Sequence, residues 1–436
     1  MIVRSDPKTP SSDLRNGALI SKDQAQTSKK ILYMTTTEQE ANIPEERAAN
    51  GAPAGIEEEA ITPFPFDAEK ISISNQVLSI EALVRRLNQG TIYPPRIQRR
   101  GNLWNPGQQS RLVESMMLRI PLPLFYVAAD DEDNWNVVDG LQRLTTIEHY
   151  IRKQDFALCE LEFMREYEGK KFDALPQKMQ NRIFETQLSL AIINPSTPAE
   201  VQRNVFKRLN TGGLPLSAQE IRHALYFGFS AELLKELVDS KWFQKATNNS
   251  VNDTRMGGRE MILRFLAFFL RGDQYPKNED MDTFLSETMQ LLNLMPEGLP
   301  QEKMQKIFGE NHTQIQVAST DVEEIKRFFY LAMERAYTLF DIYAFRKSPP
   351  GMPYRTPINK SLFEAWSVVL AKMSEGKFQT LVENKDMLAQ KMRREIYESD
   401  SGFENSISRD SHKLSGVKNR YQILQQIVQD TIQEKG

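Results

Sequence analysis

The sequence predicts a mixed α/β core, of the α+β or α/β class, followed by a mostly α-helical domain. Short apolar runs alternate with amphipathic segments between residues 63 and about 195, whereas helical spacing dominates the rest of the chain. Residues 1–62 are rich in small, polar and acidic residues and show no sustained period. We therefore expect a disordered arm over residues 1–62, an α/β domain over 63–215 and a helical domain over 216–436.

Local signals place the elements of the α/β part in order. Asn105, Pro106 and Gln108 form the start of a helix that should run to about Leu118, because they supply an N-cap, a proline in the first turn and a capping-box partner. An acidic turn separates two short apolar runs that predict a β-hairpin. In chain order, we expect a helix over 79–87, the helix over 105–118, strands over 124–129 and 135–138, a helix over 141–153, a strand over 156–163, a helix over 176–185 and a strand over 187–193.

The second half carries repeated helix-start signals. Ser217 with Glu220 and Thr320 with Glu323 have capping-box spacing, and Asn359 precedes an apolar helical face. The segment 261–270 is apolar nearly all round, which is typical of a buried helix. Long amphipathic patterns over 321–343 and 417–434 complete a predicted helical domain.

Composition excludes several classes of protein. A net charge of −3 argues against coating nucleic acid by bulk charge, and the single cysteine, Cys159, excludes a disulfide framework within the chain and a cysteine-built zinc site. Neither a His-Glu-x-x-His pattern nor a Walker-type phosphate loop occurs. The longest apolar run is too short to span a bilayer and no apolar signal core is seen at the N-terminus, so we expect a cytoplasmic protein that does not contact a membrane.

The segment from Asp139 to Arg143 is the first candidate for chemistry. A strand delivers Asp139 into a turn at Gly140, and a helix begins directly after it with Gln142 and Arg143 in its first turn. Arginine offers a forked donor suited to phosphate, while a carboxylate can hold Mg²⁺ against the same phosphate. The alternative is a common Asp-Gly turn followed by a surface arginine.

Arginines and amides around one tryptophan form the second candidate. Such a set can grip phosphates and stack a base, although a solvated loop with the tryptophan in the core would look the same. Its members are Arg96, Gln98, Arg99 and Arg100 before Trp104, and Gln108, Gln109 and Arg111 after it.

A glycine-rich helix end is the third candidate. Arg208, Asn210, Thr211 and Gly212 could contact a phosphate closely, or could simply end a helix. Weaker candidates for nucleic-acid contact lie in a basic stretch near the C-terminus, namely Lys413, Lys418 and Arg420. His149 could line the first site, and Arg222 and His223 could face the third or lie on a helix surface.

Taken in order, these segments resemble a known family, the N-terminal domain family of the GmrSD type IV restriction endonucleases, whose core is similar to the ParB/sulfiredoxin fold. The resemblance is carried by the runs 93–99, 101–104, 109–115, 120–123, 138–144, 206–213 and 219–225 and covers roughly residues 75–430. The strongest of them is Val138-Asp139-Gly140-Leu141-Gln142-Arg143-Leu144.

The resemblance implies a site that binds an NTP with Mg²⁺ and hydrolyses it, in a protein related to DNA and to defence against foreign DNA. The family's Asp-Gly-Gln-Gln-Arg motif carries over onto Asp139, Gly140, Gln142 and Arg143, with Leu141 in place of the first glutamine. Asp139 would hold the metal, and Gln142 and Arg143 would act in catalysis. Gln98 and Arg99 would contact phosphates, and the family's Phe-x-x-x-Asn motif carries over onto Phe206 and Asn210.

Two other functions remain open. The chain could be a nucleic-acid-binding module without turnover, using Arg96, Arg100, Arg111 and the C-terminal basic residues, or it could be a direct ParB-like nuclease. His312 and His412 show no recognisable nuclease signature, so we expect the His-Me finger nuclease of the full restriction enzymes to be missing and any cleavage to need a separate nuclease or other defence subunit.

Overall fold

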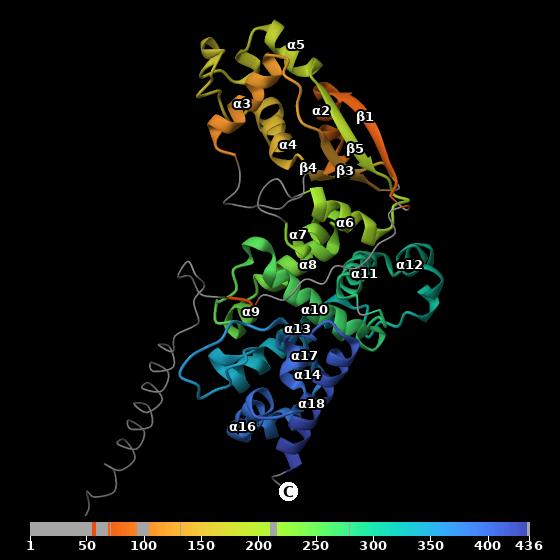
Figure 1. The fold of residues 1–436 in the computed structure, drawn as a ribbon, viewed down its shortest axis with the longest axis vertical. Coiled ribbons are helices and arrows are strands. Elements are labelled where there is room, and N and C mark those ends of the chain that lie inside the picture. Colours follow the sequence, from red (N-terminus) through yellow and green to blue (C-terminus); the bar gives the residue numbers. More distant parts are fainter. Residues whose placement is uncertain are drawn as a thin grey trace, which may run out of the picture.

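Five strands form one mixed sheet in the order β1-β5-β3-β4-β2 (Figure 1). The β1–β5 and β3–β4 pairs are antiparallel, and the β3–β5 and β2–β4 pairs are parallel. The computed structural model describes residues 55–57, 69, 71–93, 104–130, 132–209, 216–278 and 280–433. The strands are β1 (Ile73–Ser79), β2 (Ile92–Tyr93), β3 (Phe125–Ala129), β4 (Trp135–Asp139) and β5 (Gln187–Ile193).

Four helices share a core with one face of this sheet. Because side chains alternate across a strand, Val137 of β4 enters this core together with Val127 of β3. Val113 and Leu144, from two of the helices, are fully buried in it. The helices are α2 (Ile80–Gln89), α3 (Pro106–Met117), α4 (Leu141–Ile147), which continues as a π-helical turn (Glu148–Lys153), and α5 (Gln177–Glu185).

The opposite face of the sheet carries a smaller core. It joins Val138 of β4 to Phe206 of α6 (Ala199–Leu209) and to Ile221 of α7 (Ala218–Leu225). These two helices therefore lie between the sheet and the helices of the second half of the chain, as Figure 1 shows.

The rest of the described chain is mainly helical, and its helices share one large apolar core, except that Met304 of α12 (Gln301–Phe308) packs with Leu291 and Leu294 in a small separate core. α10, which is buried along nearly its whole length, occupies the centre of the large core together with the aromatic rings of α13 and α14. The helices are α8 (Phe229–Val238), α9 (Lys241–Ala246), α10 (Gly257–Arg271), α11 (Met281–Leu294), α12 (Gln301–Phe308), α13 (Val322–Phe340), α14 (Lys360–Lys372), α15 (Glu375–Glu383), α16 (Lys385–Tyr397), α17 (Phe403–Ile407) and α18 (Leu414–Gln433).

One short piece of the predicted arm contacts this helical part. Ile56 pairs with Ile358 and packs on the core, and Glu57 accepts hydrogen bonds from Lys347 and Asn359 at 2.7 Å each. Residues 55–57 therefore pack on the helical part. The rest of the predicted arm, residues 1–54 and 58–62, lies outside the described residues, and its disorder stays a prediction.

The predicted fold class is confirmed, and so are most of the predicted elements. The 124–129 and 135–138 runs form the antiparallel pair β3–β4, and Asn105 and Gln108 form the expected capping box. The predicted domain limits and the likeness to the ParB/sulfiredoxin fold stay predictions. Within the described residues, we find no helix with the length and apolar character needed to cross a membrane.

Two predictions of local structure are wrong, and one strand was not predicted. Residues 156–163 form no strand, and several of their backbone N–H groups donate to side chains of α3 instead: Cys159 to Ser110 at 3.0 Å and Phe163 to Glu114 at 2.8 Å. The N-cap of α13 is Asp321 rather than Thr320, since its carboxylate accepts hydrogen bonds from the backbone N–H groups of Glu323 and Glu324. The sequence does not predict β1, because β1 is an edge strand with a mostly exposed, polar sequence.

Candidate functional site

The first candidate segment lies where β4 ends and α4 begins. Asp139 is the last residue of β4, and Gly140 follows with a φ of 104°. A Cβ atom at Gly140 would lie 2.5 Å from Cδ1 of Phe125, so only glycine fits this turn without strain. The turn thereby brings the backbone directly from Asp139 into the first turn of α4, where Gln142 and Arg143 lie.

Arg143 is the most heavily engaged side chain of this segment. It forms an ion pair with Asp139 at 3.0 Å, donates to the carbonyls of Pro123 and Leu124, and lies 4.2 Å from the centre of the Phe125 ring. Its side chain is only 10% exposed, whereas that of Asp139 is 44% exposed. Burial lowers the pKa of Arg143 while the charge of Asp139 opposes this change. Arg143 thus anchors the 123–124 backbone and orients a carboxylate that faces solvent.

A cavity of about 650 Å³ brings the first two candidate segments together. Arg143 forms part of its wall, together with Trp104 and Arg111. The backbone N–H of Trp104 donates to Oε1 of Gln142 at 3.2 Å, which ties the second segment to the first. The remaining lining residues are Gln108, Leu112, Ser115, Ile120, Pro121, Leu122 and Pro123.

Arg111 is the more exposed of the two arginines that line this cavity. Its side chain is 48% exposed, and its ion pair with Glu162 is loose at 3.8 Å. The cavity therefore combines Trp104, a half-exposed guanidinium on Arg111 and a buried guanidinium on Arg143. Ser115, one helical turn after Arg111 on α3, also lines the cavity and is absent from the predicted site, although the four-residue spacing places it on the same helix face.

The third candidate segment, residues 206–213, lies partly outside the described residues, which include only 206–209 of it. Phe206 packs against Val138 of β4, and Arg208 lies exposed on the last turn of α6. Asn210, Thr211 and Gly212 lie outside the described residues, as do Arg96, Gln98, Arg99 and Arg100 of the second segment.

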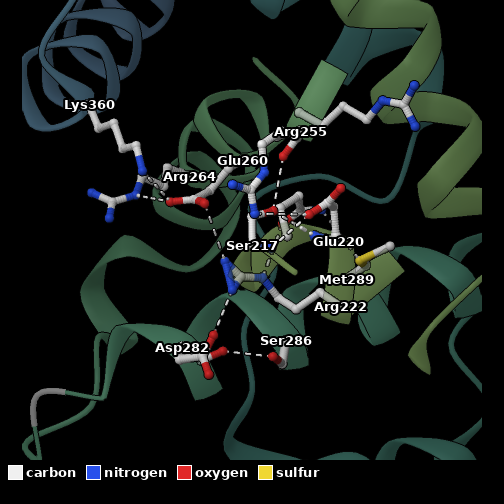
Figure 2. Close-up of polar contacts among 12 residues, drawn as sticks. Ser217, Glu220, Arg222, Arg255, Glu260, Arg264, Asp282, Ser286, Met289 and Lys360 are labelled. Atoms are coloured by element: carbon white, nitrogen blue, oxygen red, sulfur yellow. Dashed lines mark hydrogen bonds and ion pairs between the residues drawn. The ribbon is translucent and has the colours of Figure 1, made fainter. Parts of the chain in front are cut away.

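Arg222 does not face a ligand but lies in a buried charge cluster (Figure 2). Its guanidinium donates to Asp282 of α11 at 2.6 Å and lies 4.0 Å from Glu260 of α10. Glu260 in turn pairs with Lys360 of α14 at 2.9 Å. Burial alone would raise the pKa of Glu260, but the nearby charges of Lys360, Arg222 and Arg264 lower it to about 2. The cluster joins α7 to three helices of the helical part.

His223, the next residue in the chain, is also buried, but it is neutral and forms no ion pair within the described residues. It is 3% exposed, and neither ring nitrogen has a hydrogen-bond partner within the described part of the chain. Burial and the charge of Arg259 lower its pKa to about 4, so the ring is neutral at pH 7. Its ring packs edge-on against Phe227.

The weaker candidates are divided by exposure. Lys413 is exposed and pairs with Asp410 at 2.8 Å, and Lys418 is exposed on α18. Arg420 is fully buried and pairs with the equally buried Glu364 at 2.7 Å, so the prediction that it contacts nucleic acid is corrected. His149 pairs with Asp155 at 3.0 Å rather than with a residue of the candidate site.

A metal ion at this site would rely on few protein ligands. Within the described residues, no group of three or more histidine, cysteine or acidic side chains could hold a metal. Asp139 is a single carboxylate with an exposed face. This arrangement suits Mg²⁺ held by one carboxylate, water and phosphate oxygens of a bound nucleotide.

One comparison with known proteins gives a match. No curated protein and no solved structure matches the chain. Residues 80–227 match the family described as "GmrSD restriction endonuclease, N-terminal domain". This range begins with α2 and ends just after α7, so it contains the cavity, the Asp139–Arg143 turn and both helices on the opposite sheet face. This match supports the resemblance of residues 80–227 to the GmrSD N-terminal domain family.

Proposed function

We propose that this chain binds an NTP in the cavity beside Asp139 and hydrolyses it with Mg²⁺, as part of a DNA-related defence system. The observation that carries the proposal is the meeting of Trp104, Arg111 and Arg143 in one cavity. Asp139 does not line this cavity, but its exposed carboxylate is paired with Arg143 at 3.0 Å. Nucleotide phosphates need cations and forked donors, and a nucleobase needs an aromatic face. The family match supports the link to DNA restriction.

The two arginines take different roles in this proposal. Arg111, which is half exposed and loosely paired, is the group that can close on a phosphate. Arg143 is already committed to Asp139 and to two backbone carbonyls, so it acts mainly by holding the carboxylate and presenting a fixed positive charge. Gln142 is held by the Trp104 backbone and is placed to orient a water molecule or a phosphate oxygen.

Asp139 is the residue that would hold Mg²⁺. The bound metal would neutralise charge on the phosphates, which is the main requirement of phosphoryl transfer. Gly140 joins Asp139 to the first turn of α4 at a φ of 104°. Arg208 on α6, together with Gln98, Arg99, Asn210, Thr211 and Gly212, is proposed to complete the phosphate contacts.

The test measures binding and hydrolysis of the four NTPs and four dNTPs with Mg²⁺. We expect Asp139→Asn to abolish turnover and Arg111→Ala to weaken nucleotide binding at least tenfold. Asp173→Asn and Arg165→Ala remove an exposed carboxylate and an exposed guanidinium from the same part of the chain and should leave both measurements unchanged.

Two outcomes would replace the proposal. Salt-dependent binding of DNA that survives Asp139→Asn, with no nucleotide binding, would identify a nucleic-acid-binding module. Metal-dependent nicking of DNA that is lost in Asp139→Asn, again without NTP turnover, would identify a direct nuclease.

A further inference from the structure

A second and larger cavity lies at the other end of the molecule, in the helical part. Its volume is about 920 Å³, and it runs along α18 between that helix, the end of α14 and the residues just after α10. Figure 1 shows α18 far from the sheet that carries the Asp139 turn. This groove is therefore independent of the proposed nucleotide site.

The floor of this groove is apolar and aromatic. Phe268 and Tyr275 stack with their ring centres 5.5 Å apart, and Tyr421 of α18 lies 5.9 Å from Phe268. Val368 and Val428, from two different helices, are buried at the base. Half-buried Leu414, Val369, Met373 and Ile432 extend the apolar surface.

The wall formed by α18 has the spacing of a helix-packing seam. The seam residues alternate at intervals of four and three along five steps, which is the heptad pattern of one helix packed along another. They span about 27 Å of helix. In chain order they are Leu414, Lys418, Tyr421, Gln425, Val428 and Ile432, and all six line the groove.

The rim of the groove is mainly basic. Lys372, Lys377 and Lys418 line it, and all three are exposed. Lys372 also lies 5.5 Å from the Phe269 ring centre. Asp273 is the single acidic residue among the lining residues, while nearby Glu375 is bound to Arg335 at 2.7 Å.

We infer that this groove binds an amphipathic helix of a partner protein, with its apolar stripe against the seam of α18 and acidic side chains toward the three lysines. The apolar floor supplies the area that a helix buries in a groove of this kind. Charge complementarity at the rim selects an acidic partner. Gln425, the polar seam residue that is not a rim lysine, fixes its register, as polar residues do at core positions of coiled coils.

The experiment uses the full chain and three fluorescent synthetic peptides of three heptads each. The first has Leu and Ile at the core positions and Glu at the flanking positions; the second has Lys in place of Glu; the third has the first peptide's composition in scrambled order. Fluorescence anisotropy should show that the acidic heptad peptide binds at least tenfold more tightly than either of the others.

Charge reversal on the rim tests the orientation of the binding surface. The double variant Lys372→Glu/Lys418→Glu changes two exposed residues and should weaken binding of the acidic peptide at least tenfold while strengthening that of the basic peptide. Lys385→Glu, an equally exposed change on α16 outside the groove, should alter neither. Circular dichroism establishes that each variant is folded.

Three results would overturn the inference. The first is equal or undetectable binding of the acidic and scrambled peptides. The second is a rim double variant that binds the acidic peptide as the original chain does. The third is saturable binding of dodecanoate that no peptide displaces, which would identify the groove as a site for a fatty acyl chain.

Discussion

The Asp139–Arg143 pair and the cluster around Arg222 are built from the same residue types but occupy opposite environments. Asp139 is 44% exposed at the end of a strand, whereas Arg222, Glu260 and Asp282 are held between four helices. From the sequence alone, Asp139, Arg143 and Arg222 are all candidates for contact with a ligand. The Asp139 carboxylate keeps an open face toward solvent, whereas the charged groups around Arg222 already satisfy one another.

The buried side of this comparison predicts the largest effect on stability. Arg420→Met removes a fully buried cation and leaves Glu364 without its closest partner, so the free energy of unfolding should fall by about 3–5 kcal/mol. Urea unfolding measures the change. The double variant Arg420→Met/Glu364→Leu removes both charges and should recover at least half of the loss. A loss below about 1 kcal/mol in the single variant would contradict this view of the pair.

Glu260 predicts an acid sensitivity that belongs to the buried cluster. Its pKa is lowered from 4.5 in the unfolded chain to about 2 in the folded chain. The ionised carboxylate therefore stabilises the fold above pH 5, and this stability is lost as the pH falls from about 5 toward 2. Glu260→Gln should remove about 3 kcal/mol of this pH-dependent stability. Unfolding free energies measured at several pH values give the slope, and an unchanged slope below pH 5 would refute the assignment.

His223 predicts a second loss of stability at a higher pH. Its pKa is lowered from 6.5 to about 4, so the unfolded chain takes up a proton before the folded chain does. Stability present above pH 6.5 is therefore lost as pH falls toward 4, by about 3 kcal/mol. His223→Gln should flatten the curve between pH 6.5 and 4 and leave the loss at lower pH that Glu260 causes. If the variant keeps the original curve, the ring is not held neutral.

The elements that are predictable from the sequence are those whose signals are local. The capping boxes at Asn105 and Ser217 and the β3–β4 hairpin all occur as predicted, because each depends on residues a few positions apart. The segment 156–163 is not predictable in this way, because its backbone partners are Ser110 and Glu114, about fifty residues earlier. β1 depends in the same way on a partner strand more than one hundred residues away.

The candidate site shows the same limit. The Asp139–Arg143 spacing predicts two charged groups at a helix start, and the ion pair forms at 3.0 Å. From the sequence, Arg222 and Arg420 cannot be told from ligand-binding arginines, because Asp282 and Glu364, which bury them, lie 60 and 56 residues away. Their roles depend on how the helices pack, and no local pattern reports that packing.

Gly140 tests whether the open site depends on backbone geometry. Gly140→Ala adds a Cβ atom within 2.5 Å of Phe125 at a φ of 104° and should cost about 1–3 kcal/mol of unfolding free energy. Gly90→Ala is the matched control, because Gly90 has a φ of 70° but no atom within 4 Å of the added Cβ. The Gly140 variant should lose more stability than the Gly90 variant, and NTP binding should weaken only in the former. Equal losses would mean that contact with Phe125 has no cost.

Asp139→Asn should have the smallest effect on stability and the largest on the proposed activity. An ion pair whose carboxylate is 44% exposed contributes about 0–1 kcal/mol, so the urea midpoint should barely move. The same change removes the charge that the proposal assigns to Mg²⁺, so NTP turnover should disappear. Arg420→Met should show the reverse pattern: it lowers stability strongly, but the molecules that remain folded should hydrolyse NTP at the original rate. A stability loss of several kcal/mol in Asp139→Asn would place the Asp139 pair with the buried cluster, and the contrast between the two regions would no longer separate a ligand site from a structural one.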